Sequence, residues 1–214
     1  MEMEETFSIC ARTGGVHRGD GRKLDPWDWT WRPAERPETG TTRDGVGVLS
    51  HLAGQADRRS LPVGVIGPRE ATAAQLDTAE ALGRRLGALG LVVVCGGKSG
   101  VMEAVCRGAR GAGGLTVGIL PDAGWRGANA YVALPLATGL SEARNAVIAR
   151  AALVLVAIGG SYGTMTEIAY GLHFGRRVIG LEGAPDLPGL NRADSVEAAV
   201  AQVADALLAE AELS

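Results

Sequence analysis

The sequence predicts an α/β protein, a Rossmann-like doubly wound parallel sheet with helices on both faces and an irregular or short-stranded N-terminal extension. Three observations support this fold class. Several short runs are apolar throughout, as strands buried on both faces of a parallel sheet are. A segment with apolar residues at helical spacing follows most of these runs. Glycine supplies 32 of the 214 residues, which indicates many tight turns or close backbone approaches.

Five apolar runs, rich in β-branched residues and bounded by turn residues, are the predicted strands. Their crossover connections should be right-handed, and the ligand crevice should lie beyond the carboxyl ends of the strands. The predicted strands are residues 62–67, 91–95, 115–121, 153–159 and 177–182.

Apolar residues at a period near 3.6 predict a helix after most of these strands. The helix over 72–89 is stopped by Gly90, as glycine commonly does just past a helix end. Ser195 is a suitable N-cap for an amphipathic terminal helix. The remaining helices are expected at 101–110, 141–151, 163–175 and 195–213.

Residues 1–60 differ from the rest, being rich in Arg, Asp, Gly, Thr and Pro. We interpret them as an extension or arm, and residues 61–214 as the Rossmann-like nucleotide- or phosphate-binding domain. The tryptophans of WDWTW, at 27, 29 and 31, alternate as in a strand and should share one face. They would either pack onto the main domain or form an aromatic wall at a ligand site or subunit interface.

Composition narrows the class of protein. The net charge of −3 argues against a large nucleic-acid footprint. The acidic amino terminus MEMEETFSIC lacks the apolar segment of a signal peptide, and no run reaches the ~20 apolar residues of a membrane span. We therefore expect a soluble, cytoplasmic protein without a nucleic-acid or membrane partner. The three cysteines and three histidines show no metal-ligand spacing, so no metal site is predicted.

Two glycine-rich turns each join a predicted strand to a helix, where unpaired backbone N–H groups and a partial positive charge suit an anion. In the second turn, Gly160, Ser161, Gly163 and Thr164 can offer N–H groups and hydroxyls to a phosphate. The first turn would line the other side of the ligand through Gly96, Gly97, Lys98, Ser99 and Gly100.

The first turn is not one of the common nucleotide-binding loops. A triphosphate loop would need glycine where Val92 stands, and neither turn contains GxGxxG. Lys98 could neutralise a phosphate as a point charge, or be an ordinary solvated loop lysine.

The segments GGKSGVMEAVCRGA, GLTVGILP and ARNAVIARAALVLVAIGGSYGTMTEIAYGL resemble the Lonely Guy and "lysine decarboxylase-like" superfamily in order and spacing. The similarity covers roughly residues 61–208 and is closest to the branch that contains the molybdenum cofactor carrier proteins. The superfamily motif PGGxGTxxE ends at Glu167. Gly159 and Ser161 replace its proline and its second glycine, and the family's arginine–lysine pair falls at Arg144 and Asn145.

These departures are typical of the carrier branch, so the resemblance implies binding of a nucleoside monophosphate or a molybdopterin-like cofactor, with Asn145, Gly159 and Tyr162 among the contacts. The resemblance also allows an alternative function, that of a nucleoside 5′-monophosphate phosphoribohydrolase, with Arg144 and Glu167 as catalytic residues. Taken without the resemblance, Arg144 can be a surface residue and Glu167 can simply stabilise its helix. A non-enzymatic regulatory or scaffold protein is a third class, and the family implies a homodimer or higher homo-oligomer.

Overall fold

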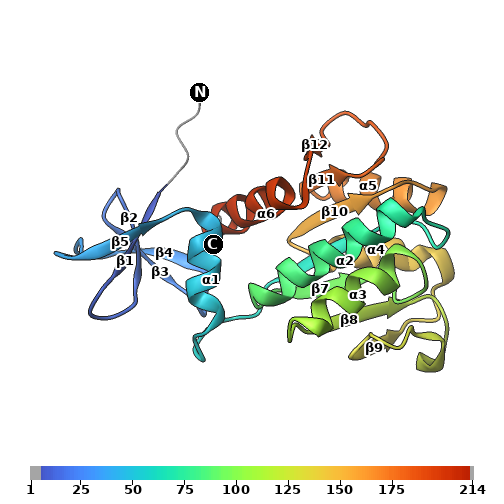
Figure 1. Cartoon of the computed structure of the whole chain (residues 1–214), viewed down its shortest axis with the longest axis horizontal. Coiled ribbons are helices and arrows are strands. Elements are labelled where there is room, and N and C mark those ends of the chain that lie inside the picture. The colour runs from blue at the N-terminus through green and yellow to red at the C-terminus, as the bar shows by residue number, and fades with distance from the viewer. Residues whose placement is uncertain (1–5, 213–214) are drawn as a thin grey trace. The chain divides into compact units, whose positions relative to one another are not determined.

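The computed structural model describes residues 6–212 of the chain, coloured in chain order in Figure 1. The start of the acidic amino terminus and the last residue of the predicted terminal helix lie outside that range. The chain divides into two compact units. One runs from Ser60 to Val203, and the other combines the residues up to Arg59 with those from Ala204 onward.

The unit that begins at Ser60 contains a parallel sheet of seven strands in the order β12-β11-β10-β6-β7-β8-β9. Strands β7, β8 and β9 are added on one side of β6 and strands β10, β11 and β12 on the other, so the order of strand addition reverses between β6 and β10. The strands are β6 (Pro62–Ile66), β7 (Val92–Cys95), β8 (Thr116–Leu120), β9 (Leu134–Ala137), β10 (Val154–Ile158), β11 (Arg177–Leu181) and β12 (Asn191–Arg192).

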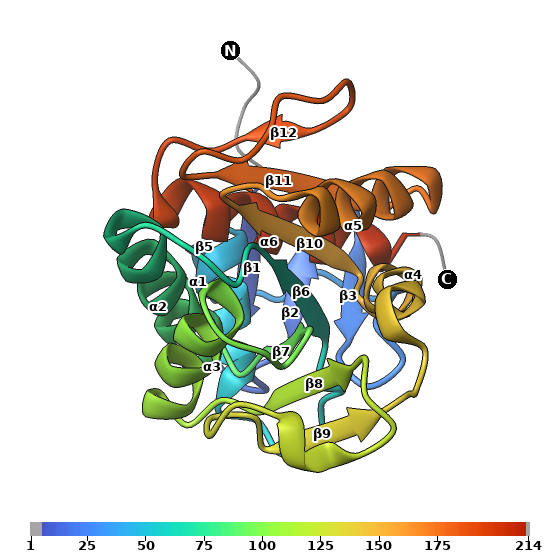
Figure 2. The same ribbon diagram turned by 90° about the vertical axis from the view of Figure 1, so that its right-hand side faces the viewer.

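Helices cover both faces of this sheet, with α2 and α3 on one face and α4 and α5 on the other (Figure 2). The predicted doubly wound fold is confirmed. Within residues 6–212 no helix is both long and apolar enough to cross a bilayer. The helices are α2 (Ala73–Ala88), α3 (Val101–Gly111), α4 (Arg144–Ala151), α5 (Tyr162–His173) and α6 (Val196–Glu210), with short 3-10 turns η1 (Trp125–Gly127) and η2 (Ser141–Ala143).

Local sequence explains where these helices begin. Thr72 caps α2 through a capping box, in which its hydroxyl accepts from the Gln75 N–H and the Gln75 side chain accepts from the Thr72 N–H. The helix predicted over 141–151 is a 3-10 turn followed by α4, because Ser141 has φ of +48° and no side chain caps the helix before Arg144.

The core under α4 and α5 is built around Leu155 of β10, which is fully buried. A Cβ on Gly64 of β6 or on Gly171 of α5 would lie about 2.4 Å from the Leu155 side chain, so both glycines make room for it. Full burial of a leucine contributes roughly 1.5–3 kcal/mol. Cys95 and Cys106 are buried thiols 3.5 Å apart on the other side of β6, as expected of small core groups.

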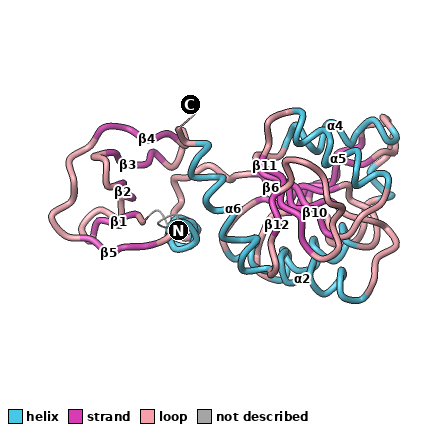
Figure 3. The backbone as a smooth tube through the Cα atoms, turned by 90° about the horizontal axis from the view of Figure 1, so that it is seen from above, coloured by secondary structure: helices cyan, strands magenta, loops and turns pink. Residues whose placement is uncertain are grey.

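The other unit contains an antiparallel sheet in the order β4-β3-β2-β1-β5 and a helix capped by Asp44 (Figure 3). Its strands are short, which confirms the short-stranded alternative for the extension. The elements are β1 (Phe7–Cys10), β2 (Val16–Arg18), β3 (Arg22–Asp25), β4 (Thr30–Pro33), β5 (Gly40–Arg43) and α1 (Gly45–Ala53). The last turns of α6 belong to this unit.

The prediction that the three WDWTW tryptophans share one face of a strand is wrong. Asp25 accepts hydrogen bonds from the Trp27 and Asp28 N–H groups, so the chain turns before β4. Trp29 then has φ of +56° and is buried, whereas Trp27 is 56% exposed. The Trp29 indole N–H donates to the Leu207 carbonyl of α6 at 2.6 Å.

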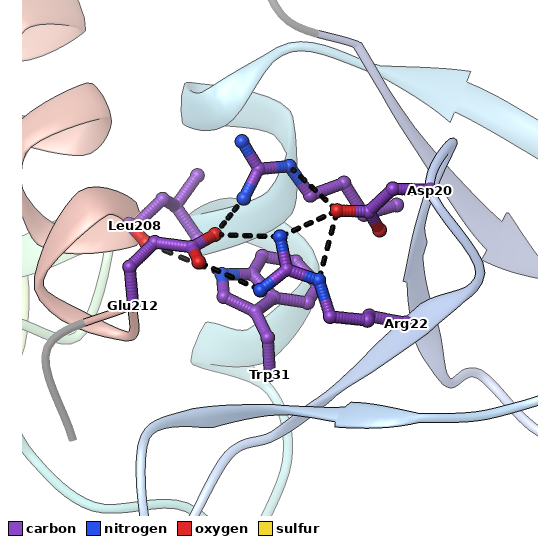
Figure 4. A network of polar contacts seen from close by, with 6 residues as sticks. Asp20, Arg22, Trp31, Leu208 and Glu212 are labelled. Carbon is purple, nitrogen blue, oxygen red and sulfur yellow. Dashed lines mark hydrogen bonds and ion pairs between the residues drawn. The ribbon is translucent and has the colours of Figure 1, made fainter.

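Trp31 is also buried, and it packs in a polar network within the same unit (Figure 4). Its indole N–H donates to the Leu208 carbonyl at 3.3 Å, and its ring stacks on Phe7. Arg18 and Arg22 form ion pairs with Glu212 beside the ring. Two of the three tryptophans therefore pack on the end of α6, which the sequence analysis assigned to the main domain but which belongs to the smaller unit.

Candidate functional site

The main cavity of the larger unit lies where doubly wound sheets bind their ligands. It has a volume of about 490 Å³ and opens beyond the carboxyl ends of β6 and β10, the adjacent strands at which the sheet order reverses. The loop after β6 and the start of α5 form much of its wall. Residues 67–70 come from that loop, and Gly160, Ser161, Gly163 and Thr164 come from the turn into α5.

The start of α5 is capped by a serine hydroxyl. Ser161 is its N-cap, in an extended conformation, and its hydroxyl accepts from the Thr164 N–H at 3.2 Å. The Ser161 and Thr164 hydroxyls are 3.0 Å apart. The first N–H groups of a helix have no partner within the helix, and apart from the Thr164 N–H, which the cap takes, no hydrogen bond within residues 6–212 engages those of Ser161 and Gly163, two residues that line the cavity.

Gly163 leaves open space at this helix start. A Cβ at Gly163 would have its nearest neighbour 3.7 Å away, at the Ser161 hydroxyl, so glycine is not required there by packing. Gly160 is more confined, since a Cβ there would lie 3.0 Å from the Pro185 ring. Gly159 has φ of +61° and packs on the Gln75 side chain. Tyr162 is 87% exposed and does not line the cavity.

A buried polar network closes the cavity floor. Arg144, the first residue of α4, donates from Nη1 to Glu167 Oε1 at 2.9 Å and to Asn145 Oδ1 at 2.7 Å. Asn145 in turn donates to the Thr166 hydroxyl at 2.8 Å. Three members of this network, Arg144, Asn145 and Glu167, are buried and line the cavity, whereas Thr166 is exposed. The Arg144 Nε is buried with no hydrogen-bond partner within residues 6–212, so the network still has a donor to offer.

Glu167 is electrostatically unusual. Burial raises its pKa to about 7, although the neighbouring Arg144 guanidinium acts in the opposite direction. At neutral pH the carboxyl group therefore exists in both protonation states. A group with such a pKa can take up or release a proton near pH 7, which suits either a hydrogen-bond donor to a ligand or a general acid or base.

The structure brings none of the five residues of the first glycine turn, 96–100, into the lining of this cavity, so the prediction that this turn lines the other side of the ligand is wrong. Gly96 and Gly97 are buried, and the Gly97 N–H donates to Cys95 Sγ. Gly96 lies against the network instead, because a Cβ there would be 2.6 Å from Arg144 Nη2. The turn is thus a support for Arg144, within the core, rather than part of the cavity wall.

The remaining residues of the first turn face another space. Lys98 forms an ion pair with Asp122 and donates to the Gly127 carbonyl at 2.9 Å. Lys98 and Ser99 line a second cavity of about 340 Å³. Gly100 has φ of +70° and is packed so closely that a Cβ would lie 2.3 Å from the Arg69 carbonyl oxygen.

Sequence reasoning missed the loop after β6. Gly67, Pro68, Arg69 and Glu70 line the main cavity, and Arg69 brings a cation to it. The signal was present, since this loop ends the first predicted strand and the crevice of such folds lies at strand ends. This signal identifies the loop as part of the cavity only when the strand order is known, because that order places β6 next to β10 and β7 one strand further away.

Comparisons with known proteins show the family of the chain. The profile of the SLOG cluster4 family matches residues 60–210, most of the chain. An uncharacterized protein of Archaeoglobus fulgidus is 36% identical over 140 residues, which cover 65% of this chain and 92% of that protein.

Two of the similar solved structures are proteins named for the molybdenum cofactor. The molybdenum cofactor binding protein of Rippkaea orientalis is 32% identical with a TM-score of 0.65, over 69% of this chain and 97% of its own. The molybdenum cofactor carrier protein of Chlamydomonas reinhardtii is 34% identical with a TM-score of 0.64, over 69% and 99%. These matches confirm the resemblance to the carrier branch.

A more distant match shows the fold alone. DNA processing protein A of Streptococcus pneumoniae is 18% identical, with a TM-score of 0.56, over 67% of this chain and 62% of its own.

Proposed function

Since this chain belongs to the SLOG cluster4 family, we propose that it binds a phosphorylated small molecule, a molybdopterin-like cofactor or a nucleoside monophosphate, in the cavity beyond the carboxyl ends of β6 and β10. The observation that supports the proposal is the start of α5, where Ser161, Gly163 and Thr164 line a cavity of about 490 Å³ and the Ser161 and Thr164 hydroxyls lie 3.0 Å apart. Cavities of roughly 300–1,000 Å³ are typical of small-molecule sites.

The donors around the cavity fit the anionic part of such a ligand. Ser161, Gly163 and Thr164 would hold a phosphate through N–H groups and hydroxyls, and Arg69 would add positive charge from the loop after β6. The buried Arg144 Nε supplies one further donor. Cys95 and Cys106 do not line the cavity, so the chain would hold a molybdenum cofactor by its organic part rather than by thiolate bonds to the metal.

Only the second glycine turn enters this proposal as the anion site. Lys98 is already paired with Asp122, and the Gly97 N–H is already used within the core. We therefore assign the phosphate to the start of α5, and give Gly96 the role of supporting the Arg144 guanidinium.

Hydrolysis of an N-glycosidic bond is a second candidate, favoured by the pKa of about 7 of Glu167 beside Arg144. The carboxylate could stabilise an oxocarbenium-like transition state or activate water. Incubation with AMP followed by chromatography would detect free adenine. Release of adenine that stops in Glu167→Gln would promote this candidate, and no release from the wild-type protein would remove it.

Isothermal titration calorimetry with AMP and with molybdopterin tests the binding proposal. Gly163→Asp adds a negative charge at the proposed phosphate site, and its Cβ is not crowded, because the nearest side-chain atom would be the Ser161 hydroxyl at 3.7 Å. A carboxylate there should weaken binding at least ~10-fold, equivalent to about 1.4 kcal/mol of lost interaction with the helix start.

Gly124→Asp is the matched control. It adds the same charge at another glycine with open space around it and a negative φ, away from the cavity. We expect Gly124→Asp to bind as the wild-type protein does. Equal affinities of all three proteins for both ligands, or no binding of either ligand to the wild-type protein, would contradict the proposed function.

A further inference from the structure

The N-terminal sheet has two chemically different faces. Strand pairing places Ser8 opposite His17 and His17 opposite Lys23, so these side chains share one face with Cys10. The opposite face carries buried apolar residues, Phe7, Val16, Leu24 and Trp31 among them. The sheet therefore buries its apolar face within its own unit and leaves a face of polar and nucleophilic side chains that the overall fold does not explain.

A cavity of about 530 Å³ lies on this polar face. The three strand residues Cys10, His17 and Lys23 line it, together with Arg12 and Thr13 of the β1–β2 turn. The loop over residues 35–39 lines the rest. The cavity lies wholly within the smaller unit and shares no residue with the cavity at α5.

His17 lines this cavity without a partner of its own. The residue is only 8% exposed, yet its imidazole makes no hydrogen bond within the part of the chain that the structure describes. Burial, reinforced by the charge of Lys23, holds the pKa of His17 below its ordinary value. Within residues 6–212 the His17 ring nitrogens are not among the fully buried atoms that lack a partner, so they are accessible from the cavity that His17 lines, and a ligand there would form a hydrogen bond with the imidazole.

The charges around the cavity also differ from those elsewhere on the sheet. Arg12, Lys23 and Arg36 line the cavity, and none of them forms an ion pair within residues 6–212. By contrast, Arg32 on the same face is paired with Asp25 and Asp28. The acidic residues of the loop, Glu35 and Glu38, offset part of this charge and leave the cavity lining with a net positive formal charge.

We propose that this cavity is a second ligand site of the chain, which takes a small molecule with a carboxylate or phosphate group held between His17 and Lys23. Arg12 and Arg36 supply further positive charge to the same group. The site is independent of the proposed function, because its residues and the α5 cavity belong to different units.

Cys10 makes the proposal measurable, because it is the one partly exposed thiol of the chain's three cysteines, while Cys95 and Cys106 are buried. A hydrogen bond from Thr13 is the main reason that the pKa of Cys10 lies below its ordinary value, which favours the reactive thiolate. An anion in the cavity should shield this thiol from alkylation by iodoacetamide.

The experiment measures the alkylation rate of Cys10 in the full chain by mass spectrometry. Inorganic phosphate and succinate are tested separately against sodium chloride at equal ionic strength. We expect at least one of them to slow alkylation ~5-fold or more, beyond general salt screening. Protection by phosphate, by succinate or by both assigns the ligand class, and protection by neither overturns the proposal.

Two variants locate the effect. Lys23→Gln should abolish the protection, whereas Arg32→Gln, which removes the same charge from the same face outside the cavity, should retain it. Equal protection in both variants would refute the site. In the wild-type protein, the protecting anion should shift the His17 imidazole signals in an NMR titration and leave those of His51 and His173 in place. Unmoved His17 signals at saturation would overturn the proposal without any variant.

Discussion

Replacing the buried Glu167 by glutamine should change how the stability of the protein depends on pH. The native carboxyl group has a pKa of about 7, raised by burial from an ordinary 4.5. Each tenfold change in a protonation equilibrium is worth about 1.4 kcal/mol, so the charged form of Glu167 destabilises the native state by about 3 kcal/mol relative to the protonated form. This is a large share of the stability of a typical domain.

The sign follows from which state holds the proton. Between pH 4.5 and about 7 the native state binds more protons at Glu167 than the unfolded state does, so stability falls as pH rises. The contribution of the protonated group is complete below pH 4.5 and is lost once pH has passed about 7. Glutamine cannot ionise, so Glu167→Gln should gain about 3 kcal/mol relative to the wild-type protein over that range.

Urea unfolding followed by circular dichroism, at a series of pH values from 4.5 to 8, measures this difference. The substitution also changes the contact with Arg144, which can shift the free energy of unfolding by a constant amount. This constant cancels when the stability of each protein at one pH is compared with its own stability at another pH. Glu80→Gln is the control, because a hydrogen bond from Arg107 lowers the pKa of Glu80 and its contribution is instead lost as pH falls. Wild-type and Glu167→Gln stabilities that run parallel over the whole range would refute the reasoning.

Two further predictions concern the two units separately, both measured by urea unfolding. Leu155→Ala opens a cavity in the core of the larger unit and should destabilise that unit by about 2–5 kcal/mol. Leu136→Ala is the control, because this side chain is 43% exposed and its loss should change stability by less than ~0.5 kcal/mol. Similar losses in both variants would contradict the assigned core. Trp29→Phe leaves the Leu207 carbonyl without its indole donor and should destabilise the N-terminal unit by about 1–3 kcal/mol. Trp27→Phe, at the exposed tryptophan, should be close to neutral. Equal effects of the two substitutions would show that the buried hydrogen bond is unimportant.

The parallel sheet could be predicted from sequence because its central strands are apolar along their whole length. Val92–Cys95 and Val154–Ile158 are buried at every position, which gives a continuous signal. The edge strand β9 could not be found in this way, since its sequence LPLA is largely exposed and contains a proline. The two-residue strand β12 is too short to leave a pattern.

The strands of the N-terminal sheet could not be predicted individually, for a different reason. Its strands are three or four residues long and include segments such as RKLD and GTTR, in which charge and polarity hide the alternation. The WDWTW segment has a strand-like spacing, but Trp29 adopts a positive φ that no propensity rule assigns to tryptophan. Tertiary packing against α6 decides that conformation.

Part of the candidate site could be predicted from the sequence and part could not. The motif around the second glycine turn predicted a helix start that faces a cavity, and the resemblance singled out Arg144 and Glu167, which the structure places 2.9 Å apart. Whether the two glycine turns line the same cavity could not be predicted from the sequence, because the answer depends on the order of the strands in the sheet. β6 lies between β7 and β10, so the loop at 67–70 takes the place next to the second turn.

Native mass spectrometry of the protein purified from its own cells tests the central claim most directly. If an anionic ligand sits at the start of α5, the wild-type protein should carry a small phosphorus-containing molecule, Gly124→Asp should carry it as well, and Gly163→Asp should be free of it. A bare wild-type protein, or a ligand that Gly163→Asp retains at the same occupancy, would contradict the account.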